Sequence, residues 1–280
     1  MKMLFLGTGS ASCLKNRQSN MAILRNNKTL LLDAGGDLRW ALNDNGLSYR
    51  NINAVYVTHL HGDHVGGLEY LALCSYFDPS MKDSQIEIIA NSHLMRDLWT
   101  HVLYGGLRTI QGMRTSLMDF FDVTAIPDNG RFVWEDLEFN IVQSVHIMDG
   151  YSIVPSYGLM IHDPDTRKRV FVTGDTQFNP NQIIDFYKQA DLIIQDCETT
   201  PYKSGVHANY SELKTLPAEI KAKMLLTHYG DNVVATGDNG RGEGIAAEWL
   251  GRIGEDGFKL GFAIRGCTVD TQELIGEEAK

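Results

Sequence analysis

The residues best able to do chemistry lie in one short segment that contains three histidines and one aspartate. The segment reads Thr58-His59-Leu60-His61-Gly62-Asp63-His64. An apolar strand is predicted to end just before it, so the alternate side chains of His59 and His61 point the same way and can bind one cation. The glycine turn then directs Asp63 and His64 to a neighbouring point. Since imidazoles and carboxylates are ligands for zinc, iron and manganese, the segment predicts a metal-binding loop.

The overall composition restricts the partners of the protein. The chain has 280 residues, of which 43% are hydrophobic and 21% charged, as is typical of a soluble globular protein. Its formal net charge is -10, and no basic run interrupts this acidity. Because a negative surface repels phosphate backbones, we expect no long nucleic acid as a partner. A chain of this length can form one α/β unit, and we expect a single domain over residues 1–280.

The cysteines and the apolar stretches indicate the compartment. The four cysteines are scattered, without a Cys-x-x-Cys pair, at Cys13, Cys74, Cys197 and Cys267. This pattern predicts buried free thiols in a reducing compartment. The N-terminal apolar stretch is too short for a signal peptide, and no stretch reaches membrane-spanning length. We therefore expect a cytoplasmic protein with no membrane partner.

Short apolar segments bounded by Gly, Asp or Asn predict strands along the whole chain. They are residues 2–6, 21–25, 29–33, 54–58, 86–90, 122–126, 131–134, 137–144, 157–162, 169–173, 192–195, 223–227 and 259–264. Helices are predicted at 64–74, at 91–103 behind a capping Asn, and at 179–189, which begins Asn-Pro. Dominant strands with interspersed helices indicate two packed sheets with helices outside.

Residues 104–121 differ from the rest because they mix three glycines with several apolar side chains. A helical excursion here could cover a site as a lid. A surface helix that buries only its own apolar stripe explains the composition about as well. An acidic turn, Asp196-Cys197-Glu198, follows the predicted strand 192–195, and the sequence assigns no role to it.

Four further motifs, each at a predicted strand end, follow the same order as those of a known family. They are Leu30-Leu31-Leu32-Asp33-Ala34-Gly35, His146, Thr173-Gly174-Asp175-Thr176 and Leu226-Thr227-His228-Tyr229. With the histidine-rich segment, they resemble the metallo-β-lactamase superfamily over the length of the chain. The resemblance implies an α/β fold of the αββα metallo-β-lactamase sandwich type, with metals at one edge of the two sheets. In that fold, Asp33 would orient the metal loop from behind the ligands.

The resemblance also implies a site for two divalent metal ions, either zinc or iron. The ligands of one ion would be His59, His61 and His146. The ligands of the other would be Asp63, His64 and His228, with Asp175 bridging both ions. Zinc β-lactamases carry Cys at the position of Asp175, whereas Asp favours a bridged pair of metals. β-Lactamase activity is therefore not expected.

The segments 5–11 and 19–20 resemble the ribonuclease Z-like tRNA 3′-processing endonucleases and their small phosphodiesterase relatives. Those nucleases have a His-Ser-Thr motif where this chain has residues 205–210, so only His207 matches. Their long basic arm is also missing, which argues against tRNA processing. His207 could act beside the metals as a proton donor or oxyanion partner. A buried structural histidine bonded to a backbone carbonyl is nearly as good an interpretation.

Two functions of different classes fit this site. We favour a metal-dependent hydrolase of a small phosphodiester or ester, in which a metal-bridging hydroxide attacks and His207 and Asp63 are catalytic. The alternative is a non-hydrolytic di-iron protein that binds or senses dioxygen or redox state, because the same ligands suit iron. The expected partner is thus a small-molecule substrate or dioxygen, with a protein partner for a sensor. A homodimer is a further option.

Overall fold

Two β-sheets pack face to face in the computed structural model, which describes residues 1–236 and 242–275. The first sheet contains β1 (Lys2–Gly7), β2 (Asn20–Arg25), β3 (Lys28–Leu32), β4 (Ala54–Val57), β5 (Ile86–Asn91), β8 (Phe121–Ile126) and β17 (Thr268–Asp270). Its strand order is β17-β1-β2-β3-β4-β5-β8. The second sheet contains β9 (Arg131–Trp134), β10 (Leu137–Met148), β11 (Ile153–Asp163), β12 (Lys168–Val172), β13 (Leu192–Asp196) and β14 (Met224–Thr227). Its order is β14-β13-β12-β11-β10-β9.

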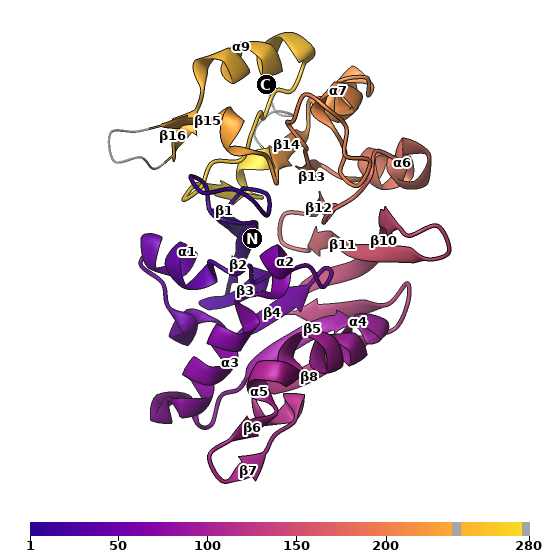
Figure 1. Cartoon of the computed structure of the whole chain (residues 1–280). Helices are drawn as coiled ribbons and strands as arrows, with labels where there is room; N and C mark the ends of the chain where they lie inside the picture. Colours follow the sequence, from indigo (N-terminus) through magenta and orange to yellow (C-terminus); the bar gives the residue numbers. More distant parts are fainter. Residues whose placement is uncertain (237–241, 276–280) are drawn as a thin grey trace.

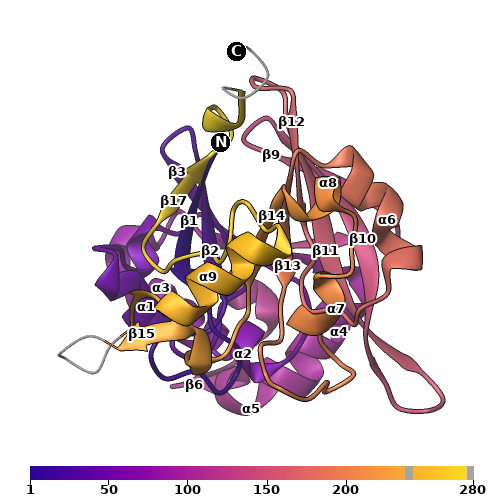
Figure 2. The same ribbon diagram turned by 90° about the horizontal axis from the view of Figure 1, so that it is seen from above.

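Helices cover the outer faces of both sheets (Figures 1 and 2). On the side of the first sheet are α1 (Leu38–Asp44), α2 (Gly62–Val65), α3 (Leu68–Phe77), α4 (Ser92–Asp97) and α5 (Tyr104–Leu107). On the side of the second sheet are α6 (Pro180–Gln189), α7 (Tyr210–Leu213), α8 (Ala218–Lys221) and α9 (Ala247–Asp256). Two small hairpins add β6 (Thr109–Ile110) with β7 (Met113–Arg114), and β15 (Val234–Thr236) with β16 (Gly242–Ile245). None of the helices in these described ranges is long and apolar enough to cross a membrane.

The alternation of side chains along each strand builds the layers. In β12, Val170 and Val172 join the core between the two sheets, whereas Phe171 between them joins a second core under the outer helices. Ile183 and Tyr187 of α6 belong to that second core. The predicted αββα metallo-β-lactamase sandwich is therefore confirmed.

Parallel pairing brings the ends of distant strands to one edge. Strands β3 and β4 run parallel in the first sheet, and β12, β13 and β14 run parallel in the second. The carboxyl ends of parallel strands meet at the same edge, where ligands bind in open α/β sheets. His59 lies just beyond β4, and Asp175 and His228 lie just beyond β12 and β14. This edge therefore collects the chemistry-bearing side chains.

The predicted elements hold with two exceptions. Residues 259–264 form no strand, only an isolated bridge at Phe262, because Gly261 adopts a left-handed φ of 68° that interrupts the pleat. The predicted helix 64–74 is split into α2 and α3 at Gly66 and Gly67, where the Gly67 N–H donates to the Ala34 carbonyl. The predicted burial of the four thiols holds for Cys13 and Cys197, whereas Cys74 is half-buried and Cys267 is exposed in the turn before β17.

Residues 104–121 form α5, the β6–β7 hairpin and a short 3-10 turn rather than one long helix. The hairpin protrudes at the lower end of the molecule in Figure 1. The Tyr76 hydroxyl of α3 contacts the Met113 sulfur at 4.0 Å, and the Gln85 amide donates to the Met118 carbonyl at 3.2 Å. The segment thus packs beside α3, and its role as a lid stays a prediction.

Candidate metal centre

The structure brings the seven predicted metal ligands together in two groups that share one carboxylate. The first group is His59, His61, His146 and Asp175. The second group is Asp63, His64, Asp175 and His228. Within each group, the atoms that could bind a metal lie within 4.8 Å of one another. Such an arrangement of imidazoles and carboxylates can hold divalent cations.

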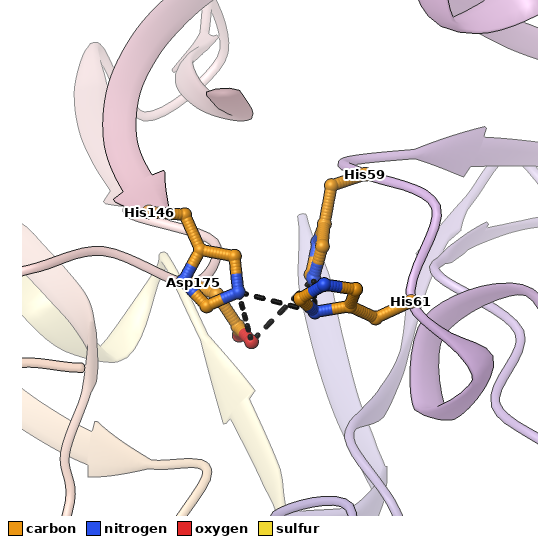
Figure 3. Close-up of side chains that lie close together, drawn as sticks. All are labelled: His59, His61, His146 and Asp175. Carbon is orange, nitrogen blue, oxygen red and sulfur yellow. Dashed lines mark hydrogen bonds and ion pairs between the residues drawn. The ribbon is translucent and has the colours of Figure 1, made fainter. Parts of the chain in front are cut away.

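The first group joins the two sheets (Figure 3). His59 and His61 come from the loop after β4, His146 from β10 and Asp175 from the loop after β12. His61 Nδ1 lies 3.1 Å from His59 Nε2 and 3.1 Å from His146 Nε2. Asp175 Oδ2 lies 3.6 Å from His59 Nε2 and 3.7 Å from His146 Nε2. Three ring nitrogens and one carboxylate oxygen therefore face a common point.

The second group surrounds the same Asp175 oxygen. His64 Nε2 lies 3.3 Å from Asp175 Oδ2 and 3.4 Å from Asp63 Oδ2. His228 Nε2 lies 3.2 Å from Asp63 Oδ2 and 3.6 Å from Asp175 Oδ2. The backbone of His228 has a left-handed φ of 59°, which turns the chain sharply after β14. This conformation is rare outside glycine and often occurs at functional sites.

Asp33 fixes the metal loop from behind. One of its carboxylate oxygens accepts the backbone N–H of Thr58 at 2.8 Å, and the other accepts the Thr58 hydroxyl at 2.7 Å. The second oxygen also lies 2.7 Å from His64 Nδ1. His64 Nε2 therefore points into the site, where it is buried and has no hydrogen-bond partner among the described residues. A buried nitrogen left in this way fits a metal ligand.

The other histidines are oriented in the same manner. His146 Nδ1 lies 2.8 Å from the Val206 carbonyl, to which it donates, so its Nε2 is free of a proton and faces the site. His228 Nδ1 lies 3.3 Å from the Asp196 carboxylate. Metal-binding histidines usually donate their second ring N–H to a carboxylate or a carbonyl in this way. The donor set and its supports fit divalent metal ions.

The two groups differ in charge. Burial lowers the pKa values of the first group's imidazoles, of His59, His61 and His146. These rings are thus neutral near pH 7, which is the form that binds a metal. In the second group, burial also opposes the charged form of His228, but Asp175 and Asp196 outweigh it and raise the pKa of His228 to about 10. In the second group, His228 therefore carries positive charge at the position where a cation would bind.

His207 stands beside this centre without belonging to either group of predicted ligands. Its Nδ1 lies 2.9 Å from an oxygen of Asp196, rather than against a backbone carbonyl. Its ring lies 4.9 Å from that of His228, and 21% of its side chain is exposed. The same Asp196 oxygen accepts the backbone N–H of Thr176 at 2.9 Å. The Asp196 carboxylate thus binds His207 through one oxygen and lies beside His228 with the other.

Comparison with known proteins identifies the family. The sequence model of the family described as Anti-Pycsar protein Apyc1 matches residues 1–246. The chain belongs to this family. The Apyc1 protein of Paenibacillus sp. (strain J14) is 34% identical over 236 residues, which cover 83% of this chain and 91% of that protein. The Apyc1 protein of Bacillus phage BSP38 is 32% identical over 234 residues, which cover 81% and 88%.

Solved structures confirm the fold of this Apyc1-family chain. The metallo-β-lactamase fold protein YhfI from Bacillus subtilis is similar with a TM-score of 0.68 at 15% identity, covering 96% of this chain and 98% of that one. Zn(2+)-bound PqqB from Methylobacterium extorquens has a TM-score of 0.69 at 16% identity, covering 96% and 100%. A diphosphatase from the PhnP family has a TM-score of 0.67 at 16% identity, covering 96% and 97%. Identities this low show the fold alone.

Sequence reasoning assigned no role to Asp196, which the structure of this Apyc1-family chain places beside the candidate metal ligands. It appeared only as part of an acidic turn, yet it is a buried carboxylate at the end of β13. Its position at a strand end could have revealed it. Parallel strands also end at or just before four other residues of the site, Asp33, His59, Asp175 and His228. Asp196 lies within reach of Asp175, His207 and His228 in a third group of ligand-type atoms.

Proposed function

We propose that this Apyc1-family chain is a metal-dependent hydrolase that cleaves a small phosphodiester. The observation that carries the proposal is the single buried carboxylate of Asp175, shared by two groups of imidazole and carboxylate ligands. The name of the curated relatives, Anti-Pycsar, hints at degradation of a cyclic nucleotide, so a cyclic mononucleotide is the proposed substrate. The net charge of -10 also favours a small substrate over a long nucleic acid.

Each ligand would have a distinct role. His59, His61 and His146 would hold one ion, and Asp63, His64 and His228 the other. Asp175 would contact both ions. When bound, two such ions supply Lewis acidity to the phosphodiester oxygens and lower the pKa of water from 15.7 towards about 7. Asp63 is held ionised, since the hydrogen bond from His228 and the nearby imidazole of His64 outweigh its burial and keep its pKa well below the usual value. It can therefore also orient the attacking water.

His207 is the proposed proton donor to the leaving oxygen. Burial opposes its charged form, but the charge and hydrogen bond of Asp196 outweigh burial and raise its pKa above the usual value. The ring therefore keeps its proton to a higher pH than an ordinary histidine does. Because Nδ1 is held by Asp196, Nε2 is the nitrogen available to deliver a proton.

The proposal is tested on protein purified without added metal. Elemental analysis should find divalent metal, and the protein should cleave bis-p-nitrophenyl phosphate and 3′,5′-cyclic mononucleotides. A chelator should abolish both activities, and zinc or manganese should restore them. Two irons per chain, with absorption bands that change on exposure to oxygen and no cleavage of either substrate, would instead support the di-iron alternative.

A further inference from the structure

A cavity of about 250 Å³ opens beside His207 and His228. Its walls come from the loop after β1, with Ser10 and Ser12, and from the segment after β13, with Glu198. We propose that this cavity binds the sugar of the substrate, and that Glu198 recognises a sugar hydroxyl next to the scissile ester. This inference rests on the proposed phosphodiesterase function and names the part of the substrate that the protein recognises.

The wall formed by the loop after β1 is held rigidly against the metal centre. Ser10 donates its backbone N–H to the carbonyl of Tyr229, the residue after His228, at 3.2 Å. The Cys13 thiol donates to the same carbonyl at 3.0 Å. Beyond the turn, the Leu14 backbone N–H donates to the Asp231 carboxylate at 2.9 Å. Because these bonds tie the loop to the residues after β14, the cavity exists before a ligand binds.

Glu198 is fixed by one of its two carboxylate oxygens. Oε2 accepts the Ser204 backbone N–H at 3.0 Å and the Asn209 amide at 3.1 Å. Its backbone is also held, since its N–H donates to Ala208 at 2.9 Å and its carbonyl accepts from Tyr210 at 2.8 Å. None of the described residues donates a hydrogen bond to Oε1. An oriented carboxylate thus keeps one oxygen available at the wall of the cavity.

The hydroxyl groups near Glu198 do not offer protons to the cavity. Thr199 donates its hydroxyl to the Asn232 side chain at 2.9 Å, and Thr200 donates its own to the Tyr202 carbonyl at 2.6 Å. No lysine or arginine occurs among the described residues that line the cavity. Among the described lining residues, only His207 and His228 beside the metal centre can carry a positive charge, and the wall around Glu198 is rich in acceptors. It suits a neutral group that donates hydrogen bonds and not a second phosphate.

The size and the position of the cavity favour the sugar as the group that it binds. The cavity is smaller than the roughly 300–1,000 Å³ of pockets that enclose drug-sized ligands, so it takes one small group. It adjoins His207, the proposed proton donor, and the sugar is the group bonded directly to the phosphodiester oxygens. In a 3′,5′-cyclic ribonucleotide, the 2′-hydroxyl lies next to the 3′ ester and is a donor. Carboxylates recognise a ribose 2′-hydroxyl in the same way in dinucleotide-binding folds.

The test compares a 3′,5′-cyclic ribonucleotide with its 2′-fluoro-2′-deoxy analogue, in which the hydroxyl is replaced by a group that cannot donate. The wild-type protein should prefer the ribonucleotide by about 10- to 100-fold in kcat/KM, as expected for a hydrogen bond to a charged acceptor. In Glu198→Gln, the amide oxygen must face the donors of Ser204 and Asn209, so the NH₂ group takes the place of Oε1. The variant should discriminate by less than about 3-fold.

A matched control and two contrary outcomes complete the test. Glu219→Gln changes an exposed carboxylate on α8 and should keep the wild-type ratio. Equal rates for both nucleotides with the wild-type protein, while bis-p-nitrophenyl phosphate is cleaved, would overturn the sugar-binding inference alone. A wild-type preference for the ribonucleotide that persists in Glu198→Gln would also overturn it. Absence of bis-p-nitrophenyl phosphate cleavage by the wild-type protein would remove the proposed function itself.

Discussion

Two buried aspartates, Asp175 and Asp163, lie at opposite ends of the second sheet and are surrounded very differently. Asp163 is the last residue of β11, whereas the residues of β10 next to His146 pair with the first residues of β11. Asp163 accepts the Met1 ammonium at 2.8 Å and the Thr271 hydroxyl at 2.7 Å. Around Asp175, by contrast, ring nitrogens approach one another and the carboxylate at 3.1–3.7 Å.

The difference distinguishes a carboxylate that is paired within the protein from one that could hold a metal ion. At Asp163, an amino-terminal charge from one sheet and a carboxylate from the other neutralise each other within the protein. At Asp175, by contrast, His64 Nε2 is buried without a hydrogen-bond partner among the described residues, and ring nitrogens of His61 and His146 lie 3.1 Å apart. Such a cluster can be stabilised by a bound cation, and burial alone does not distinguish the two cases.

The largest expected effect follows removal of the shared carboxylate. Asp175→Ala should lose both metal ions and reduce phosphodiester cleavage by more than about 10³-fold, because both groups of ligands depend on it. Elemental analysis and a cleavage assay measure the two effects. Asp163→Asn, which changes the other buried aspartate, should keep its metal content. Retention of both ions in Asp175→Ala would refute the ligand assignment.

Removal of the proposed proton donor should separate metal binding from catalysis. His207→Ala should lower kcat by about 10²- to 10⁴-fold, as expected for loss of a general acid, while the metal content stays at the wild-type level. The control is His93→Ala, since the His93 side chain is 62% exposed and lies on α4. A His207→Ala protein with wild-type kcat would exclude this role.

The Asp163 cluster should control stability and not activity. Asp163→Ala leaves the buried Met1 ammonium without its carboxylate and should lower the free energy of unfolding by about 3–5 kcal/mol in urea titrations. Cleavage per folded molecule should not change. Asp165 is also an ion-pair partner of Arg25, but its side chain is 66% exposed. Asp165→Ala should therefore lower the free energy of unfolding by less than about 1 kcal/mol. Equal losses in the two variants would contradict the structural role of Asp163.

The smallest expected effect is the pH dependence of the stability that the Asp163 cluster provides. Burial opposes ionisation of Asp163, but hydrogen bonds from the Met1 ammonium and Thr271 outweigh it and lower its pKa to about 2. A folded pKa below the unfolded value stabilises the protein above about pH 4, by about 2 kcal/mol, and the stabilisation is lost as the pH falls towards 2. The stability difference between wild type and Asp163→Asn should therefore narrow over this range. A stability difference that stays constant over this pH range would show that ionisation of Asp163 does not cause the stabilisation.

Most of the sandwich was predictable because alternation and turn residues are local signals. The errors occur where distant contacts override them. Helix α9 was not predicted because Gly251 and Gly254 weaken its helix propensity, yet Trp249 and Ile253 bury one face of it in the outer core. The predicted strand at 259–264 fails at Gly261, whose left-handed φ no alternation pattern reveals.

For the site, the sequence by itself determined the ligand types and the order of the motifs, with His59 to His64 as the strongest signal. The ligand set came from the resemblance, because the sequence spacing between His64, His146 and His228 does not indicate that these residues lie close together in space. Only the tertiary structure decided that Asp196 lies beside two histidines and that Glu198 lines a cavity. These depend on β-strand ends and loops far apart in sequence, which meet only when both sheets are packed.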